Sequence, residues 1–210
     1  MRKQVTIIFI AAMLAAPATV LAADSENWMF RVRALDMKPK NESDPIPSLG
    51  VPADAIHVKD KLFPEVDFSY FFTSNIAAEL ILTYPQKHDV TLSGTKIGSV
   101  KHLPPTLTLQ YHFHPTSTVT PYIGAGFNYT RFSDVNLSAG AGLALDLEKS
   151  STGGALQVGV DIEVAKNRYL NFDLKKVSIE SDVILKSNGA KVSHINIDPT
   201  LFSIGYGWKF

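Results

Sequence analysis

The sequence predicts an all-β chain that forms an eight-stranded antiparallel transmembrane β-barrel, with short periplasmic turns and long extracellular loops. Apolar and polar residues alternate with period 2 in eight segments, which is the pattern of strands with two unlike faces. Apolar residues make up 45% of the chain. Apart from the leader, however, no apolar run approaches the roughly 20 residues of a membrane-spanning helix. Alternating apolar strands in an exported chain are typical of outer-membrane barrels.

Residues 1–22 have the three parts of a secretory signal peptide: a basic start, an apolar run and a small-residue cleavage point at Val20 and Ala22. The alternative is a transmembrane anchor, which Pro17 inside the apolar run disfavours. We therefore expect residues 1–22 to be cleaved and residues 23–210 to form one transmembrane β-barrel domain.

Charge and cysteine content exclude several classes of protein. Without the leader, which holds Arg2 and Lys3, 18 basic and 20 acidic residues remain, a net charge of −2. This balance argues against a nucleic-acid partner. The chain has no cysteine, so its own core or a membrane must stabilise it after export. We expect an integral multi-pass protein of a Gram-negative outer membrane, monomeric and in contact with outer-membrane lipid.

The four N-terminal strands are predicted at residues 27–38, 58–72, 75–84 and 103–113. Each carries aromatic or aliphatic side chains on one face and smaller or polar ones on the other. In chain order the apolar faces are Trp28, Phe30, Val32 and Ala34; Val66, Phe68 and Tyr70; Ile76, Ala78, Leu80 and Leu82; and Leu107, Leu109, Tyr111 and Phe113.

The four C-terminal strands are predicted at residues 119–132, 153–164, 168–180 and 197–210. The third of these follows the turn AKNR, and the others alternate as before. Their apolar faces include Ile123, Ala125, Phe127 and Tyr129; Leu156, Val158, Val160 and Ile162; and Phe202, Ile204, Tyr206, Trp208 and Phe210. The opposite faces hold glycines, which suit the narrow interior of an eight-stranded barrel.

Charged residues also lie on the inward faces of the predicted strands. We expect carboxylates and bases to pair across the lumen and to fill its periplasmic part. The expected partners are Glu65, Asp67, Glu79 and Asp161 with Arg31, Arg33 and Lys175.

Short connections follow the second, fourth and sixth strands, whereas residues 39–57, 85–102, 133–152 and 181–196 form long connections. This alternation is typical of outer-membrane barrels, whose periplasmic turns are short. The two longest loops could carry short helices, and the apolar stretch 139–147 is suited to lining an outer funnel.

The last strand places Tyr206, Trp208 and Phe210 on its apolar face, where they would form a periplasmic aromatic girdle at the lipid interface. A terminal aromatic strand resembles the signal read by the barrel-insertion machinery, which is therefore an expected partner during assembly. The alternative is the buried last strand of a periplasmic β-sandwich, but one alternation repeated in eight segments favours the barrel.

Five blocks of sequence, taken in order, cover almost the whole chain after the leader. They are NIAAELI (75–81), HLPPTL (102–107), PYIGAGFNYTRF (121–132), ALQVGVD (155–161) and DPTLFSIGYGWKF (198–210). Together they resemble the OmpW family of Gram-negative outer-membrane proteins. The resemblance implies an eight-stranded barrel for passive uptake of small hydrophobic molecules, the role of the family's alkane-uptake members.

The resemblance also implies a narrow apolar channel that is closed by a leucine and a tryptophan. The leucine position matches Ile81, which the alternation independently turns inward, and the tryptophan position matches Thr152 when the last blocks are aligned without gaps. Thr152 departs from the family pattern, so this constriction would be wider or would be closed by another residue.

Prolines interrupt three of the four descending strands at a similar height. Pro64, Pro104, Pro105 and Pro199 each precede the periplasmic end of a strand by about 9–11 residues, roughly the 25 Å of the apolar band. Proline donates no ladder hydrogen bond. Either the regular strand simply ends there, or the wall has an opening through which an apolar solute leaves sideways into lipid.

Other functions remain open at this stage. The long loops could act as a receptor or adhesin, and a barrel with a sealed lumen would be purely structural. No nucleophile elbow or spaced Ser–His–acid set is present, so we expect no enzyme activity and identify no catalytic residue. We likewise identify no cofactor-binding residue and no metal ligand set.

Overall fold

The computed structural model describes residues 26–47, 50–139 and 143–210, and the predicted signal peptide lies outside them. Within these ranges no helix is long and apolar enough to cross a membrane. The strands of the described residues are β1 (Trp28–Lys38), β2 (Glu42–Ser43), β3 (Ile56–Val58), β4 (Lys61–Phe71), β5 (Ile76–Leu82), β6 (Gln86–Leu92), β7 (Thr95–Leu103), β8 (Thr106–His112), β9 (Val119–Ala139), β10 (Leu143–Leu147), β11 (Ser150–Ala165), β12 (Arg168–Val177), β13 (Glu180–Leu185), β14 (Lys191–Asn196) and β15 (Thr200–Lys209).

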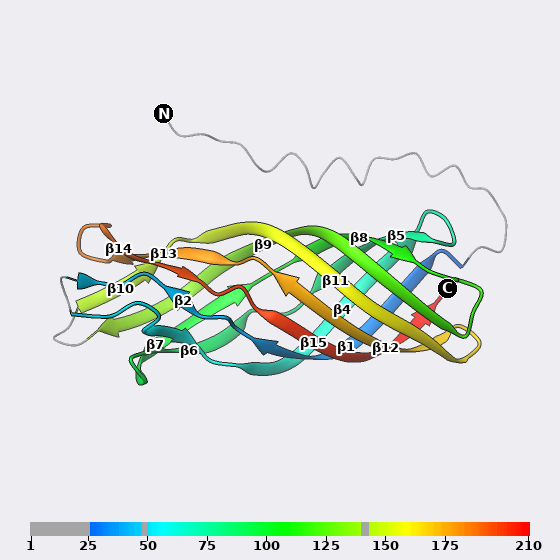
Figure 1. The fold of residues 1–210 in the computed structure, drawn as a ribbon, viewed down its shortest axis with the longest axis horizontal. Helices are drawn as coiled ribbons and strands as arrows, with labels where there is room; N and C mark the ends of the chain where they lie inside the picture. Colours follow the sequence, from blue (N-terminus) through cyan, green and yellow to red (C-terminus); the bar gives the residue numbers. More distant parts are fainter. Residues whose placement is uncertain (1–25, 48–49, 140–142) are drawn as a thin grey trace, which may run out of the picture.

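Eight long strands close into an antiparallel barrel (Figure 1). Around the wall their order is β11, β12, β15, β1, β4, β5, β8 and β9, and β9 pairs back onto β11. Short turns join β4 to β5, β8 to β9 and β11 to β12. The predicted fold class, strand number and short turns are therefore confirmed.

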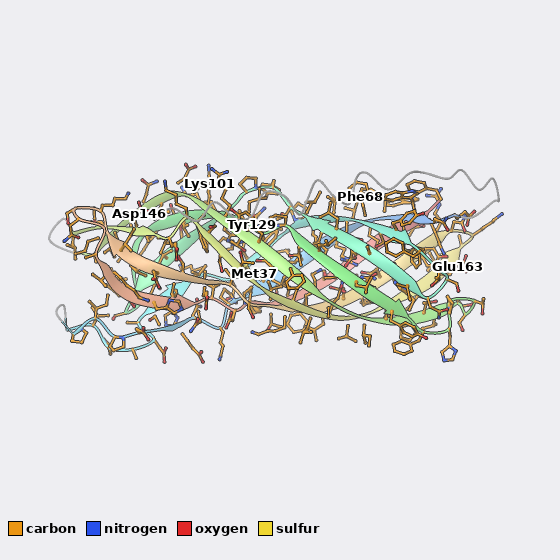
Figure 2. All side chains as sticks on the ribbon, turned by 90° about the horizontal axis from the view of Figure 1, so that it is seen from above. Met37, Phe68, Lys101, Tyr129, Asp146 and Glu163 are labelled. Atoms are coloured by element: carbon orange, nitrogen blue, oxygen red, sulfur yellow. The ribbon has the colours of Figure 1, made fainter. Side chains whose placement is uncertain are left out.

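The half of the barrel that holds the C terminus is apolar outside and polar inside. Val32 on β1 and its cross-strand partner Tyr206 on β15 face outward, whereas Arg33 and its partner Gly205 lie on the lumen side. Figure 2 shows Phe68 and Glu163 in this half, and Lys101 and Asp146 in the other. Outward apolar residues alternating with inward polar ones are the arrangement that a lipid environment stabilises.

The long connections are largely β-structure. The expected short helices are absent from residues 133–139 and 143–152, whereas Pro47 in the first long loop has 3₁₀ geometry beside residues 48–49, which lie outside the described residues. β6 and β7 pair as a hairpin, β10 pairs with β9 and β13, and β13 pairs with β14, which lengthens the barrel beyond the membrane half (Figure 1). The β6–β7 turn holds Ser93 and Gly94, both with positive φ. Such two-residue turns match the twist of a hairpin, and this Ser-Gly pair was a readable turn signal.

The polarity of the two faces inverts along a single strand, β9. Near its middle, Phe127 and Tyr129 are exposed on the outer face while Asn128 is buried in the lumen. A few residues later, Arg131 lies on the outer face and Phe132 on the inner face. The extracellular half of the barrel is thus apolar inside and polar outside, as a strand wall surrounded by water requires.

The extracellular half has its own hydrophobic core. Aliphatic side chains from strands of both the barrel and its extension pack together there, among them Val58, Val90, Val100, Leu137, Leu145, Val183 and Ile195. Leu145 and Leu147 come from the stretch that the sequence assigned to an outer funnel, and residues 140–142 of that stretch lie outside the described residues.

Close packing in the membrane half requires a residue without a side chain at Gly159. A Cβ atom there would lie 2.4 Å from the ring of Tyr122, whose side chain is fully buried in the lumen. Gly159 therefore leaves room for a large ring inside a narrow barrel.

Candidate functional site

Two buried arginines on β1 stand at the centre of the lumen in the membrane half. Arg31 donates to Asp67 of the neighbouring strand β4 at 3.0 Å. It also donates across the lumen to Asp161 of β11 at 2.7 Å. Arg33 donates to Glu65 at 3.2 Å and to Glu79 at 3.0 Å. These contacts confirm the predicted pairing of charges across the barrel.

The network continues on the far wall and leaves few polar groups without partners. Lys175 forms ion pairs with Glu65 at 2.7 Å and Asp173 at 2.9 Å, and Tyr122 donates to Asp173 at 2.7 Å. Gln157 links Glu79 and Asp173 by two further hydrogen bonds. Buried charges need this many ion pairs and hydrogen bonds, since removing one unpaired charge from water would cost several kcal/mol. The membrane half of the lumen is therefore filled and highly polar.

A small cavity of ≈ 30 Å³ lies on the extracellular side of this network. Its apolar lining includes Leu35, Met37, Phe63, Ile81, Val177 and Leu201, and Glu65 and Lys175 of the network also border it. Ile81 thus faces the lumen, at the level where the polar part ends. A cavity of this volume has room for about two water molecules, so an organic solute enters only if the walls move.

A second apolar cavity lies in the extracellular half, inside the hydrophobic core described above. It is lined only by aliphatic side chains, among them Ile56, Val90, Val100, Leu137, Leu145, Val183 and Ile197. The lumen therefore offers two apolar compartments on the extracellular side and a charged network below them.

The structure does not place Thr152 in the lumen, so its assignment to a channel constriction needs correction. Thr152 is exposed and pairs with Tyr129, whose ring lies on the outer face. The inward neighbour is Ser151, which is buried. Side chains alternate with period 2, which puts Thr152 on the same face as the exposed Leu156 and Val158, away from the lumen.

We call the first cavity, which borders the charged network, the lower cavity, and the second one the upper cavity. The barrel wall lacks a regular ladder of backbone hydrogen bonds beside the lower cavity. The pairing of β4 with β5 ends at Val66 and Leu82. The next backbone hydrogen bond between these two parts of the chain is the one that Lys59 N donates to Asp89 O. On the other side, β5 pairs with β8 as far as Ile81, and β6 resumes pairing with β7 at Gln86. Residues 83–85 therefore have no ladder partner on either flank. We call residues 83–85 the wall gap.

Side chains link residues 59–64, at the start of β4 and just before it, to the wall gap and to β6. Lys61 Nζ donates to the Lys87 carbonyl at 2.9 Å, and Thr83 Oγ1 donates to the Pro64 carbonyl at 3.1 Å. His88 Nδ1 lies 3.1 Å from the Lys59 carbonyl. Three single hydrogen bonds thus stand where a ladder would otherwise run.

The predicted prolines have different surroundings. Pro64 borders the wall gap directly, through its carbonyl. Pro104 also lines the lower cavity. Both Pro104 and Pro105 are connected to β9, because Asn128 Nδ2 donates to their two carbonyls. Tyr129 N also donates to Pro105 O at 3.0 Å. Pro199 accepts a backbone hydrogen bond from Val177. The ladder is therefore interrupted beside Pro64 but bridged next to Pro105 and Pro199.

Aromatic residues of β15 gather on the outer face near the turn that joins β11 to β12, where Arg168 is the cross-strand partner of Trp208. Tyr206 and Phe210 are exposed, and Trp208 contacts the ring of Tyr206 at 5.0 Å and that of Phe30 at 5.9 Å. Rings of this kind are enriched where a membrane protein meets the lipid–water interface.

These features define an integral outer-membrane β-barrel with a polar lower lumen and an apolar upper one. The chain belongs to the OmpW family, whose model matches residues 25–210. It is 41% identical over 93% of its length to an uncharacterized outer-membrane protein, y4mB, of Sinorhizobium fredii, covering 85% of that protein. It is 33% identical to outer membrane protein W of Vibrio cholerae, over 96% of this chain and 95% of that one.

A solved structure shows the same architecture. The crystal structure of the outer membrane protein OprG from Pseudomonas aeruginosa superposes with a TM-score of 0.75 at 26% identity, covering 88% of this chain and 95% of OprG.

Sequence reasoning missed the wall gap and the residues that bridge it. Tyr84 and Pro85 were read as the end of one strand and the start of a loop, and Lys61 and His88 were given no role. A signal was present, because a proline after Tyr84 and a proline at position 64 of the preceding strand both remove ladder donors.

Proposed function

We propose that this protein is an outer-membrane channel for passive uptake of small hydrophobic molecules, which leave sideways through the wall gap into the lipid of the membrane. One observation carries the proposal: the apolar lumen ends on a buried charged network at the level where the wall lacks a ladder. A hydrocarbon that reached the network would have to displace paired charges, which costs far more than parting a few hydrogen bonds.

The wall gap suits such an exit for energetic reasons. Outside it lie exposed apolar side chains such as Leu62 and Tyr84, so a solute that passes stays in apolar surroundings. The bonds that cross the gap are single side-chain contacts, each worth about 0.5–1.5 kcal/mol net. Moving residues 83–85 would also widen the lower cavity, which is too small for an organic solute when the wall is closed.

The test is uptake of a radiolabelled medium-chain alkane by cells that lack their own homologue, with and without this protein, beside a charged solute of similar size. We expect faster uptake of the alkane alone. Ile81→Asp places a charge in the lower cavity and should reduce alkane uptake to the level of cells without the protein. Unchanged uptake by the wild type would contradict the proposal and would favour a loop-mediated receptor or adhesin, or a sealed barrel.

A further inference from the structure

Three unpartnered polar atoms lie together between the two apolar cavities. Six buried side-chain atoms in the described residues have no hydrogen-bond partner, and two of them, on Asp67 and Asp173, are ion-paired. Three of the remaining four are Gln86 Oε1, His88 Nε2 and His102 Nε2. Buried polar atoms are satisfied in most proteins, so a cluster of exceptions requires an explanation.

The three residues are neighbours on one hairpin. Gln86 and His102 are cross-strand partners on β6 and β7. The rings of His88 and His102 stack at 4.6 Å, and Phe63 meets His88 edge-on at 6.4 Å. All three polar side chains are at least nine-tenths buried. We call Gln86, His88 and His102 the acceptor ledge.

The acceptor ledge lies on the path between the compartments. His102 borders the lower cavity. Val90 and Val100 border the upper cavity, and Val100 is the cross-strand partner of His88. A solute that moves from the upper to the lower compartment must therefore pass this polar step.

Geometry fixes the hydrogen-bonding character of two of the atoms. A carbonyl only accepts, so the contact of His88 Nδ1 with the Lys59 carbonyl puts the proton on Nδ1 and leaves Nε2 as an acceptor. The amide nitrogen of Gln86 donates to Tyr84 O at 3.0 Å, which leaves Oε1 as an acceptor.

Both imidazoles are neutral near pH 7. Lys87 and Lys101 face outward on β6 and β7, so these strands stand above the apolar belt, in water. Burial lowers the pKa of His88, and burial together with the neighbouring His88 lowers the pKa of His102 to about 3.

We propose that the acceptor ledge binds the hydrogen-bond donor of an otherwise apolar solute, so that the preferred substrates are alcohols or phenols and not pure hydrocarbons. A hydroxyl group would donate to Gln86 Oε1 or His88 Nε2 while its apolar body occupies the adjoining cavities. A hydrocarbon of the same size leaves these acceptors unpaired while it passes. This inference rests on the proposed uptake function and narrows its substrate class.

The test compares three probes of one ring system: 1-naphthol, 1-methoxynaphthalene and naphthalene. Methylation removes the donor and keeps the oxygen. Each uptake rate is measured in cells lacking their own homologue, and the rate in cells without this protein is subtracted. The quantity of interest is the protein-dependent rate of 1-naphthol divided by that of 1-methoxynaphthalene.

We expect this selectivity ratio to be about three to ten in the wild type, the value of one net hydrogen bond. It should fall toward one in whichever variant removes the acceptor that the hydroxyl uses, Gln86→Met or His88→Phe. His88→Phe also removes a bond across the wall, but this affects both probes and cancels in the ratio. The control is His57→Phe, an exposed histidine on β3, which should keep the wild-type ratio. Heat-modifiable gel migration verifies that each variant is a folded barrel.

A wild-type ratio near one would overturn the inference, and so would a raised ratio that persists in both Gln86→Met and His88→Phe. Either result can coincide with protein-dependent uptake of naphthalene, in which case the uptake function stands and only the substrate class is wrong. Absence of protein-dependent uptake for all three probes would overturn both.

Discussion

At the scale of single residues, the membrane half of the lumen depends on buried charges that satisfy one another. Arg33 reaches Glu65, Glu79 and Asp67 within 3.2 Å, and its Nε donates to Asn171 at 2.8 Å. Replacing a whole buried network by apolar groups is often neutral, whereas removing one partner leaves uncompensated charge.

Arg33→Met should therefore lower the free energy of unfolding by about 3–5 kcal/mol, because three carboxylates lose a shared cation. The measurement is urea unfolding of the refolded barrel in lipid vesicles. Lys38→Met is the control, since Lys38 pairs with Asp36 and Asp60 at an exposed site, where an ion pair contributes about 0–1 kcal/mol. Equal losses in the two variants would show that the network does not act as a unit.

Site residues were predictable from sequence only where the strand period alone decides them. Ile81 and the paired charges follow from alternation, and they face the lumen as expected. Thr152 came from the family resemblance and not from the period, which puts it on the same face as the exposed Leu156 and Val158, away from the lumen. His88 and His102 had no sequence pattern to mark them, because their role depends on contacts across a hairpin.

At the scale of elements, the distinctive feature is the irregular stretch between β4 and the β5–β6 side. Lys61 Nζ reaches across it to the Lys87 carbonyl. In a regular ladder several backbone hydrogen bonds would hold the two strands together. Here the single hydrogen bond of Lys61 strongly influences how often the wall gap opens.

Lys61→Met keeps the aliphatic stem and removes this bond, so uptake of an apolar probe should rise about two- to threefold, in line with one weak hydrogen bond. Lys87→Met is the matched control, because the bond uses the backbone carbonyl of Lys87 and survives the change. Initial uptake rates at equal levels of folded protein give the comparison. A decrease with Lys61→Met, or an equal increase with Lys87→Met, would argue against a role for this contact in opening.

Strand boundaries were predictable for the barrel but not for its extension, and β9 shows why. The sequence predicts its end at residue 132, yet the strand runs to Ala139. Beyond Thr130 the inner face becomes apolar, since Phe132 turns inward where polar residues did before. A register shift against β7 near Asp134 then moves the alternation by one residue, so that Leu137 is the next buried side chain. A sequence interpretation that expects lipid along the whole outer face therefore ends the strand at this point.

At the scale of the whole molecule, this reversal divides the lumen into two unlike halves. Lipid surrounds the lower half, which is polar inside, and water surrounds the upper half, which is apolar inside. The wall gap lies where the two halves meet, next to the cavity that Ile81 lines. The arrangement gives an apolar solute a route into the barrel and a sideways route out, without contact with the charged network.

The most direct test of this account is a reversible disulfide across the wall gap. The chain has no cysteine, so Pro64→Cys with Tyr84→Cys introduces a single possible disulfide, at positions that face each other if the register of Val66 and Leu82 is continued. Phe68→Cys with Leu80→Cys is the control, since these residues pair on the same two strands where the ladder is intact.

We expect oxidation of the Pro64→Cys, Tyr84→Cys protein to reduce apolar uptake to the level of cells without the protein, and a reductant to restore it. The control pair should transport equally in both states. Full uptake through the oxidised gap pair would contradict lateral release, because the solute would then leave by a route that does not pass residues 83–85.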